Sequence, residues 1–242
     1  MGNSVTHGEL AAVQLPRPPL PRVLSFDCYG TLVDWETGLR KVFAEILARK
    51  REHNTNISPE QFRERWEGLQ FRLIQGPFQP YRNILKQSLA QTLASSDLPY
   101  DPMDGDALVA DVPTWRPFPE VPAALKRMRR GCRLAIISNT DNDIIGRTVE
   151  RIGVPFNSIT TAMDAGAYKP SLRPFRLALE RLGVEPVDVL HIAFGFDYDI
   201  APAKQLGCRT LWLNRKREPR PGTTVPGYTA EDLREVADAL GL

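Results

Sequence analysis

The stretch VLSFDCYGTL, residues 23–32, decides the fold of this chain. An apolar run of strand character ends abruptly at Asp27, and Gly30 and Thr31 follow it. This pattern places a carboxylate at the carboxyl end of a buried strand, which is where open α/β sheets bind their ligands. A carboxylate in that position can act as a nucleophile, and its alternative role is to cap a turn.

The composition indicates a globular enzyme-sized protein without a nucleic-acid or membrane partner. Its 242 residues are 42% hydrophobic and 25% charged, which allows one large domain or a domain with an insertion. The net charge of +2 is too small to indicate a polyanionic partner. No apolar segment is long enough to span a membrane, and the N-terminus lacks a signal-peptide core.

Three widely spaced cysteines, Cys28, Cys132 and Cys208, form neither a disulfide framework nor a metal-binding pattern. They fit a reducing compartment, so we expect a cytoplasmic location. Strand alternation turns Cys28 away from Asp27, which favours a packed thiol over a second nucleophile.

Hydrophobic periodicity divides the chain into three parts. Residues 1–21 end in a proline-rich run that predicts an extended arm. Residues 35–116 carry apolar side chains at helical spacing, with a helix start at Ser58-Pro59. Residues 22–34 and 117–242 alternate strand and helix patterns. The sequence therefore predicts an α/β fold, with a Rossmann-like parallel sheet core and an inserted helical cap.

Individual elements of the core can also be predicted from the sequence. Gly153, Gly183 and Gly207 mark the ends of three helices. Thr229 to Asp232 resembles a capping box that opens a last helix. The expected strands after the first are 133–138, 159–162, 189–194 and 210–213, and the expected helices are 142–152, 172–182 and 200–206.

Polar side chains occupy four loops at the ends of the predicted strands. The first loop carries Asp27 and Thr31, and the second carries Ser138 and Asn139. The third carries Lys169 before a proline, and the fourth carries Asp197 and Asp199. Because the loops of a doubly wound sheet meet at one edge, we expect these groups to form one site.

This order of motifs resembles the haloacid dehalogenase superfamily over residues 22–242. Phosphatases of that superfamily place a second aspartate two residues after the nucleophile, where this chain has Tyr29. Their fourth motif supplies a Gly-Asp pair, where this chain has Phe194-Gly195. Two remaining carboxylates, Asp27 and Asp199, make a poor magnesium site. The resemblance therefore implies an enzyme that uses no metal and no cofactor.

The pattern Asp-x-Tyr-Gly-Thr at residues 27–31 is similar to that of the type II (S)-2-haloacid dehalogenases. The implied chemistry is attack of Asp27 on the substrate α-carbon, followed by hydrolysis of the aspartyl ester. The resemblance implies that Lys169 keeps Asp27 ionised, and that Thr31, Ser138 and Asn139 orient the carboxylates by hydrogen bonds. It implies that Asp199 holds Lys169 or helps to activate water.

The resemblance also implies which residues contact the substrate. A cap arginine receives the leaving halide in that family, and Arg65 in the run RWEGL (65–69) is the expected one; its alternative role is an exposed helix arginine. Tyr198 is expected to line the halide cradle or simply to pack. Tyr29 and Cys28 are expected beside the substrate because they follow the nucleophile.

Three positions depart from the family pattern. Phe194 and Phe196 stand where the dehalogenases use a serine and an asparagine, and they join the expected substrate contacts. Phe175 stands where a tyrosine is usual. Asp197 could replace one of the missing polar groups. The nucleophilic half of the site is therefore expected to be intact and the water-activating half altered.

The resulting hypothesis is a metal-independent hydrolase of a small 2-substituted carboxylic acid, most simply a 2-haloacid dehalogenase. The alternatives are hydrolysis of another activated C–X bond such as the azetidine-2-carboxylate ring, a magnesium-dependent phosphatase, and a non-catalytic binding protein. A homodimer is also expected, from the resemblance and from apolar cap residues such as Trp66 and Phe78 that a thin cap would leave exposed.

Overall fold

A parallel six-stranded sheet forms the core of the computed structural model, which describes residues 20–53 and 57–242. Most of the arm predicted for residues 1–21 lies outside the described residues. The strand order is β3-β2-β1-β4-β5-β6, so β1 and its following loop lie at the centre. The strands are β1 (Val23–Phe26), β2 (Arg133–Ser138), β3 (Ser158–Thr161), β4 (Val189–Ala193), β5 (Arg209–Leu213) and β6 (Tyr228–Ala230).

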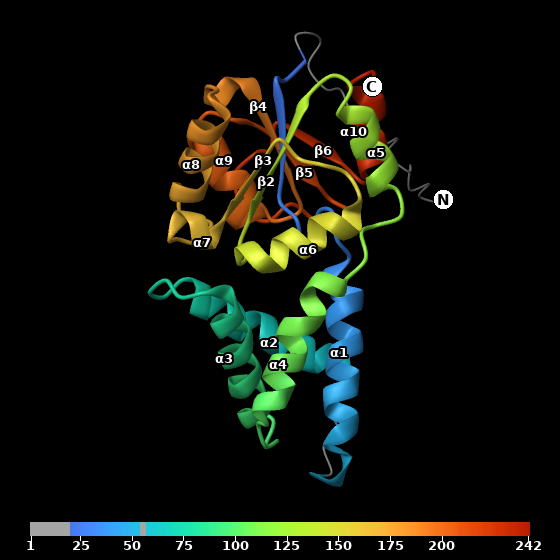
Figure 1. Ribbon diagram of the computed structural model, residues 1–242, viewed down its shortest axis with the longest axis vertical. Helices are drawn as coiled ribbons and strands as arrows, with labels where there is room; N and C mark the ends of the chain where they lie inside the picture. The colour runs from blue at the N-terminus through green and yellow to red at the C-terminus, as the bar shows by residue number, and fades with distance from the viewer. Residues whose placement is uncertain (1–19, 54–56) are drawn as a thin grey trace, which may run out of the picture.

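Helices cover both faces of the sheet, as Figure 1 shows, and this confirms the predicted α/β fold. Helices α5, α6 and α10 pack in one apolar cluster with Leu24 and Phe26, whereas α8 and α9 pack in another with Val23. Buried apolar strands between two helical layers are expected for a parallel sheet. The core helices are α5 (Val121–Met128), α6 (Asn142–Ile152), α7 (Ala162–Ala165), α8 (Arg173–Leu182), α9 (Ala201–Gln205) and α10 (Leu233–Ala239).

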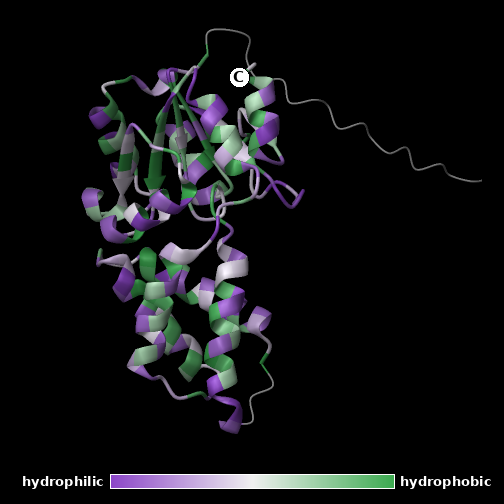
Figure 2. Ribbon diagram, turned by 45° about the vertical axis from the view of Figure 1, so that its right-hand side comes forward, coloured by the Kyte–Doolittle hydropathy of each residue, from purple (hydrophilic) through white to green (hydrophobic). Residues whose placement is uncertain are grey.

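Four further helices follow β1 and lie below the sheet in Figure 1. Helix α2 begins as its sequence predicts, since Ser58 and Gln61 form a capping box. Figure 2 shows hydrophobic residues on the sides of these helices that face one another, with hydrophilic residues outside. The helices are α1 (Trp35–Arg49), α2 (Pro59–Ile74), α3 (Tyr81–Ala94) and α4 (Pro102–Asp111), with short turns η1 (Arg51–His53) and η2 (Val112–Thr114).

Helix α3 is tied to the core by Asp141, which precedes α6. Its carboxylate accepts hydrogen bonds from the backbone N–H groups of Tyr81 at 2.7 Å and Arg82 at 3.0 Å. The N-cap residue of α3 itself, Pro80, offers no side-chain hydrogen bond. Asp141 is buried, so a residue of the core accepts the hydrogen bonds of the free N–H groups at the start of a helix in the inserted block.

The structure corrects three expectations about the elements. Thr229 lies in a sixth strand rather than in a capping box, and Asp232 caps α10. Helix α4 was not expected, because its region is rich in proline. Trp66 is only 2% exposed, so it gives no support to a dimer, whereas Phe78 is 40% exposed. No helix among the described residues is long and apolar enough to cross a membrane.

Candidate active site

Asp27 lies at the carboxyl end of β1, in the middle of the sheet, and is buried. Thr31 Oγ1 donates a hydrogen bond to Asp27 Oδ2 at 3.0 Å and accepts one from the backbone N–H of Phe194 at 3.1 Å. Gly30, which precedes Thr31, has a φ of 96°, and a Cβ there would lie 2.4 Å from the Phe194 ring. Only glycine therefore allows this tight turn under the Phe194 ring.

Lys169 joins the ends of three strands. Its Nζ, which is fully buried, donates to Asp27 Oδ1 at 2.9 Å, to Asp199 Oδ1 at 2.6 Å and to the backbone oxygen of Ile137 at 2.9 Å. Asn139 fixes the lysine backbone, because its amide exchanges hydrogen bonds of 2.8 and 3.1 Å with Lys169. Lys169 therefore lies within hydrogen-bond distance of both carboxylates, as the sequence prediction requires.

Burial and pairing act in opposite directions on the charges of this site. Burial raises the pKa of Asp27 above its ordinary value, although Lys169 and Thr31 stabilise the ionised form. Burial opposes the charge on Lys169, but Asp199 and Asp27 outweigh it and hold the lysine pKa above its ordinary value. The lysine is therefore the charged centre around which the two carboxylates are arranged.

A single π-helical turn, η4 (Phe196–Ile200), presents Asp199 to this site. Asp199 Oδ1 also contacts Nε2 of His191 at 3.1 Å, and the other ring nitrogen of His191 contacts Ser25 Oγ at 2.9 Å. Both His191 and Ser25 are fully buried. The sequence prediction missed His191; its signal was an ionisable residue inside the apolar strand β4, in register with Ser25. We call Asp27, Thr31, Lys169, His191 and Asp199 the sheet-edge cluster.

A cavity of about 410 Å³ separates this cluster from the inserted helices. Asp27, Tyr29, Asn139, Phe194 and Tyr198 line it on the core side. On the other side we define the aromatic wall as five residues contributed by α1, α2, α3 and the segment after η2: Trp35, Trp66, Phe71, Tyr81 and Trp115.

The cavity is lined by two carboxylates and by no lysine or arginine among the described residues. Burial raises the pKa of Tyr29 and of Tyr198 well above its ordinary value, so both rings remain neutral. Within the described chain, the backbone N–H groups of Tyr29 and Asn139 have no hydrogen-bond acceptor. Such free N–H groups at strand ends are suited to bind an anion.

Arg65 does not reach this cavity, which contradicts its expected position. It is exposed and donates to Ser95 O at 3.4 Å and Ser96 Oγ at 3.2 Å at the far end of α3. Two residues along a helix point in nearly opposite directions, and the buried arginine of α2 is Arg63. Arg63 pairs with Glu60 and Glu67, and its guanidinium lies 5.9 Å from the Trp35 ring centroid.

Five other expected residues lie away from the cavity or lack the expected bond. Phe196 packs edge-on against Trp212 at 5.4 Å between ring centroids, and Cys28 lies in the apolar core. The buried Ser138 hydroxyl has no hydrogen-bond partner among the described residues, and Asn139 orients Lys169 rather than a carboxylate. Asp197 is exposed, so it does not replace a polar group of the site.

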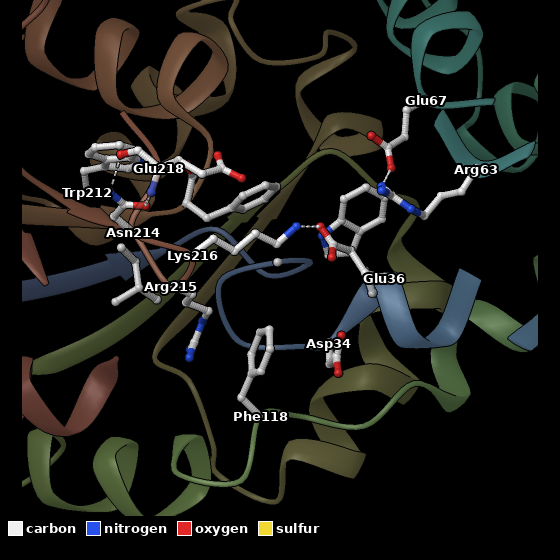
Figure 3. Close-up of a pocket in the computed structure, with 14 residues that line it drawn as sticks. Asp34, Glu36, Arg63, Glu67, Phe118, Trp212, Asn214, Arg215, Lys216 and Glu218 are labelled. Carbon is white, nitrogen blue, oxygen red and sulfur yellow. Dashed lines mark hydrogen bonds and ion pairs between the residues drawn. The ribbon is translucent and has the colours of Figure 1, made fainter. Parts of the chain in front are cut away.

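A second recess of about 430 Å³ shares Trp35, Phe194 and Glu67 with this cavity. Figure 3 shows two ion pairs in this recess, Lys216 with Glu36 and Arg63 with Glu67. The side chain of Arg215 is held by Glu120 at 2.7 Å. These cations of the second recess are therefore already neutralised by neighbouring carboxylates.

No group of three or more His, Cys, Asp or Glu side chains in the described ranges is arranged to hold a metal ion. Asp27 and Asp199 share one lysine, which occupies the space between their oxygens. The donor set here is thus an ion-paired cluster rather than a cage of hard oxygen ligands.

Comparisons with known proteins agree with this geometry. A family model described as haloacid dehalogenase-like hydrolase matches residues 21–207. The haloacetate dehalogenase H-2 of Moraxella sp. (strain B) and the (S)-2-haloacid dehalogenase of Pseudomonas sp. (strain YL) are each 27% identical over 195 residues. These alignments cover 79% of this chain and 85% and 82% of the two relatives.

A solved structure shares the fold. It is the L-2-haloacid dehalogenase from Xanthobacter autotrophicus with chloropropionic acid covalently bound. The TM-score is 0.76 at 20% identity, and the match covers 92% of this chain and 99% of that one.

Proposed function

Because this chain belongs to the haloacid dehalogenase-like hydrolases, we propose that it hydrolyses the C–X bond at the α-carbon of a 2-substituted carboxylic acid, most simply a 2-haloacid. The observation that carries the proposal is Asp27 on the floor of a cavity, with one oxygen paired to a buried lysine. The named activities of the Moraxella and Pseudomonas relatives support it.

In the first step an Asp27 carboxylate oxygen attacks the α-carbon, a new C–O bond forms, and the halide leaves with the bonding electrons. Lys169 keeps Asp27 ionised, and Thr31 holds its second oxygen in place. The substrate carboxylate is bound by the free N–H groups of Tyr29 and Asn139, since the cavity offers no cation.

In the second step water adds to the side-chain carbonyl carbon of the Asp27 ester. The ester C–O bond breaks on the aspartate side, which releases a 2-hydroxy acid and restores the carboxylate with loss of one proton. Asp199 Oδ2 has no hydrogen-bond partner in the described chain, and Asp199 is the second carboxylate of the cluster. We assign Asp199 to holding Lys169 during both steps.

The division of the chain follows from these roles. Residues 22–34 and 117–242 form the domain that carries the nucleophile, and residues 35–116 form a cap that closes the substrate cavity. The reaction as written needs no metal ion, because the nucleophile belongs to the protein and the leaving group is an anion.

Single turnover in heavy-oxygen water, with enzyme in excess over 2-bromopropionate and with EDTA present, tests this mechanism. We expect bromide release and entry of the label into Asp27, detected by mass spectrometry of the peptide that contains it. Asp27→Asn should release no bromide and keep its circular dichroism spectrum, because the amide is a poor nucleophile. Label found directly in the first-turnover product, or activity that requires magnesium, would contradict the proposal.

A further inference from the structure

Half of the residues that line the cavity on the side of the inserted helices are aromatic: they form the aromatic wall, and the others are Glu67, Gly68, Gln70, Ile74 and Val112. The aromatic wall faces Tyr29, Phe194 and Tyr198 on the core side. Three ring pairs join the two sides: Tyr29 with Trp115 at 6.1 Å, Trp35 with Phe194 at 6.3 Å, and Phe71 with Tyr198 at 6.4 Å between centroids. Aromatic rings therefore surround the space above Asp27 from both sides.

Most polar atoms of these aromatic side chains form hydrogen bonds within the protein. Trp115 donates to Asp111 at 2.7 Å, and the Tyr81 hydroxyl accepts from Gln70 at 3.2 Å. The Tyr29 hydroxyl bonds to Thr148 at 2.9 Å. The one buried exception in the wall is Trp66, whose indole N–H has no acceptor in the described chain. The wall thus offers mostly ring surface, and the Trp66 indole N–H is a buried donor without a partner in the described chain.

The size of the cavity exceeds what a three-carbon acid fills. Its volume of about 410 Å³ falls in the range of roughly 300–1,000 Å³ that holds drug-sized ligands. The carboxylate and the reacting carbon of a substrate occupy only the floor, beside Asp27, Tyr29 and Asn139. The remaining space lies against the aromatic wall.

We infer that the substrate is a 2-substituted acid with a ring-bearing side chain, which lies against the aromatic wall while its α-carbon faces Asp27. This inference rests on the proposed function for the reaction and goes beyond it in the class of substrate. Aromatic side chains bind rings through edge-to-face and offset contacts in addition to area burial. A small haloacid gains none of these contacts.

Gly68 gives a direct way to alter this space. It lies within α2, lines the cavity, and a Cβ placed on it would meet no atom within 4 Å. Gly68→Leu therefore adds a side chain at the cavity, and its Cβ meets no atom within 4 Å. Gly146→Leu is its matched control, because Gly146 is also inside a helix with open space around it and does not line the cavity.

The experiment measures bromide release from 2-bromo-3-phenylpropionate and from 2-bromopropionate. We expect kcat/KM to be about 10- to 100-fold higher for the phenyl acid, as burial of one ring predicts. Gly68→Leu should lower this ratio about tenfold or more, and Gly146→Leu should leave it unchanged. A ratio of one or less in the unmodified protein overturns the inference and leaves the proposed function standing.

Absence of bromide from both acids would overturn the proposed function instead. The inference is then decided by titration of tryptophan fluorescence with 3-phenylpropionate and with propionate, which carry no leaving group. Binding of the phenyl acid at least tenfold tighter than propionate supports the inference. Equal binding of the two acids overturns it.

Discussion

The two sides of the cavity are built on opposite principles. The sheet-edge cluster consists of polar and charged groups that lie 2.6–3.1 Å from one another, in the middle of the sheet. The aromatic wall consists of rings on helices of the inserted block, with centroids 6.1–6.4 Å from the rings they face. A charged group reacts only when hydrogen bonds and ion pairs fix its position. An aromatic ring contributes to binding when a ligand covers its face. The comparison therefore fits the proposed reaction at the sheet edge and the inferred contact of the substrate with the inserted helices.

The largest expected effect comes from breaking the sheet-edge cluster with Lys169→Ala. This leaves two buried carboxylates without their shared cation, which costs about 3–5 kcal/mol and lowers the melting temperature by roughly 10 °C. We expect activity to fall about 10³-fold or more. Thermal denaturation and halide release measure both effects. Lys86→Ala is the control, since Lys86 pairs with Asp106 at the surface, and an equal loss in both variants would contradict the role of the cluster.

A smaller change, Thr31→Val, should move the pH dependence of the reaction. Asp27 must be ionised to attack, and burial already holds its pKa above the ordinary value. The Thr31 hydroxyl stabilises the ionised form, so its removal raises the pKa further and moves the acid limb of kcat/KM to higher pH. The pH profile of kcat/KM measures this shift. Thr31→Ser keeps the hydroxyl and should restore the original profile; an unchanged limb in Thr31→Val would argue against Asp27 as the titrating group.

The smallest expected effect comes from a comparison of two arginines of α2, Arg65 and Arg63. Arg65→Ala should leave kcat/KM within about twofold, because Arg65 is exposed and bonded away from the cavity. Arg63→Ala should reduce stability by about 2 kcal/mol, because it leaves Glu67 at the cavity without its partner. Steady-state kinetics and denaturation separate the two. A large loss of activity in Arg65→Ala would restore the role first expected for it.

Local signals in the sequence were sufficient for features that depend on neighbouring residues but not for those that depend on packing. The carboxylate after β1, the lysine before proline and the helix start at Ser58 are of the first kind, and the structure has each of them where expected. Arg65 was predicted from a short sequence match, although only the packing of α2 decides which arginine faces inward. Helix α4 begins at Pro102 and contains Gly105, so its local propensity is poor and packing must stabilise it.

The site also contained features that no local pattern could reveal. His191 contacts Ser25 because β4 lies beside β1, and it contacts Asp199 because a π-helical turn follows β4. Strand β6 is three residues long and lies at the edge of the sheet, so its alternation is too short to recognise. Sheet pairing and the shape of the turn after β4 decide these features.

The contact between Asp141 and the start of α3 links the separation of the core from the inserted helices to the fraying of the first turn of α3. A helix whose first N–H groups are satisfied by a residue of another part of the chain loses that stabilisation whenever the two parts separate. The first turn of α3 is then free to fray, and it includes Tyr81 of the aromatic wall. A ligand that binds while Asp141 holds the start of α3 therefore also stabilises the first turn of that helix.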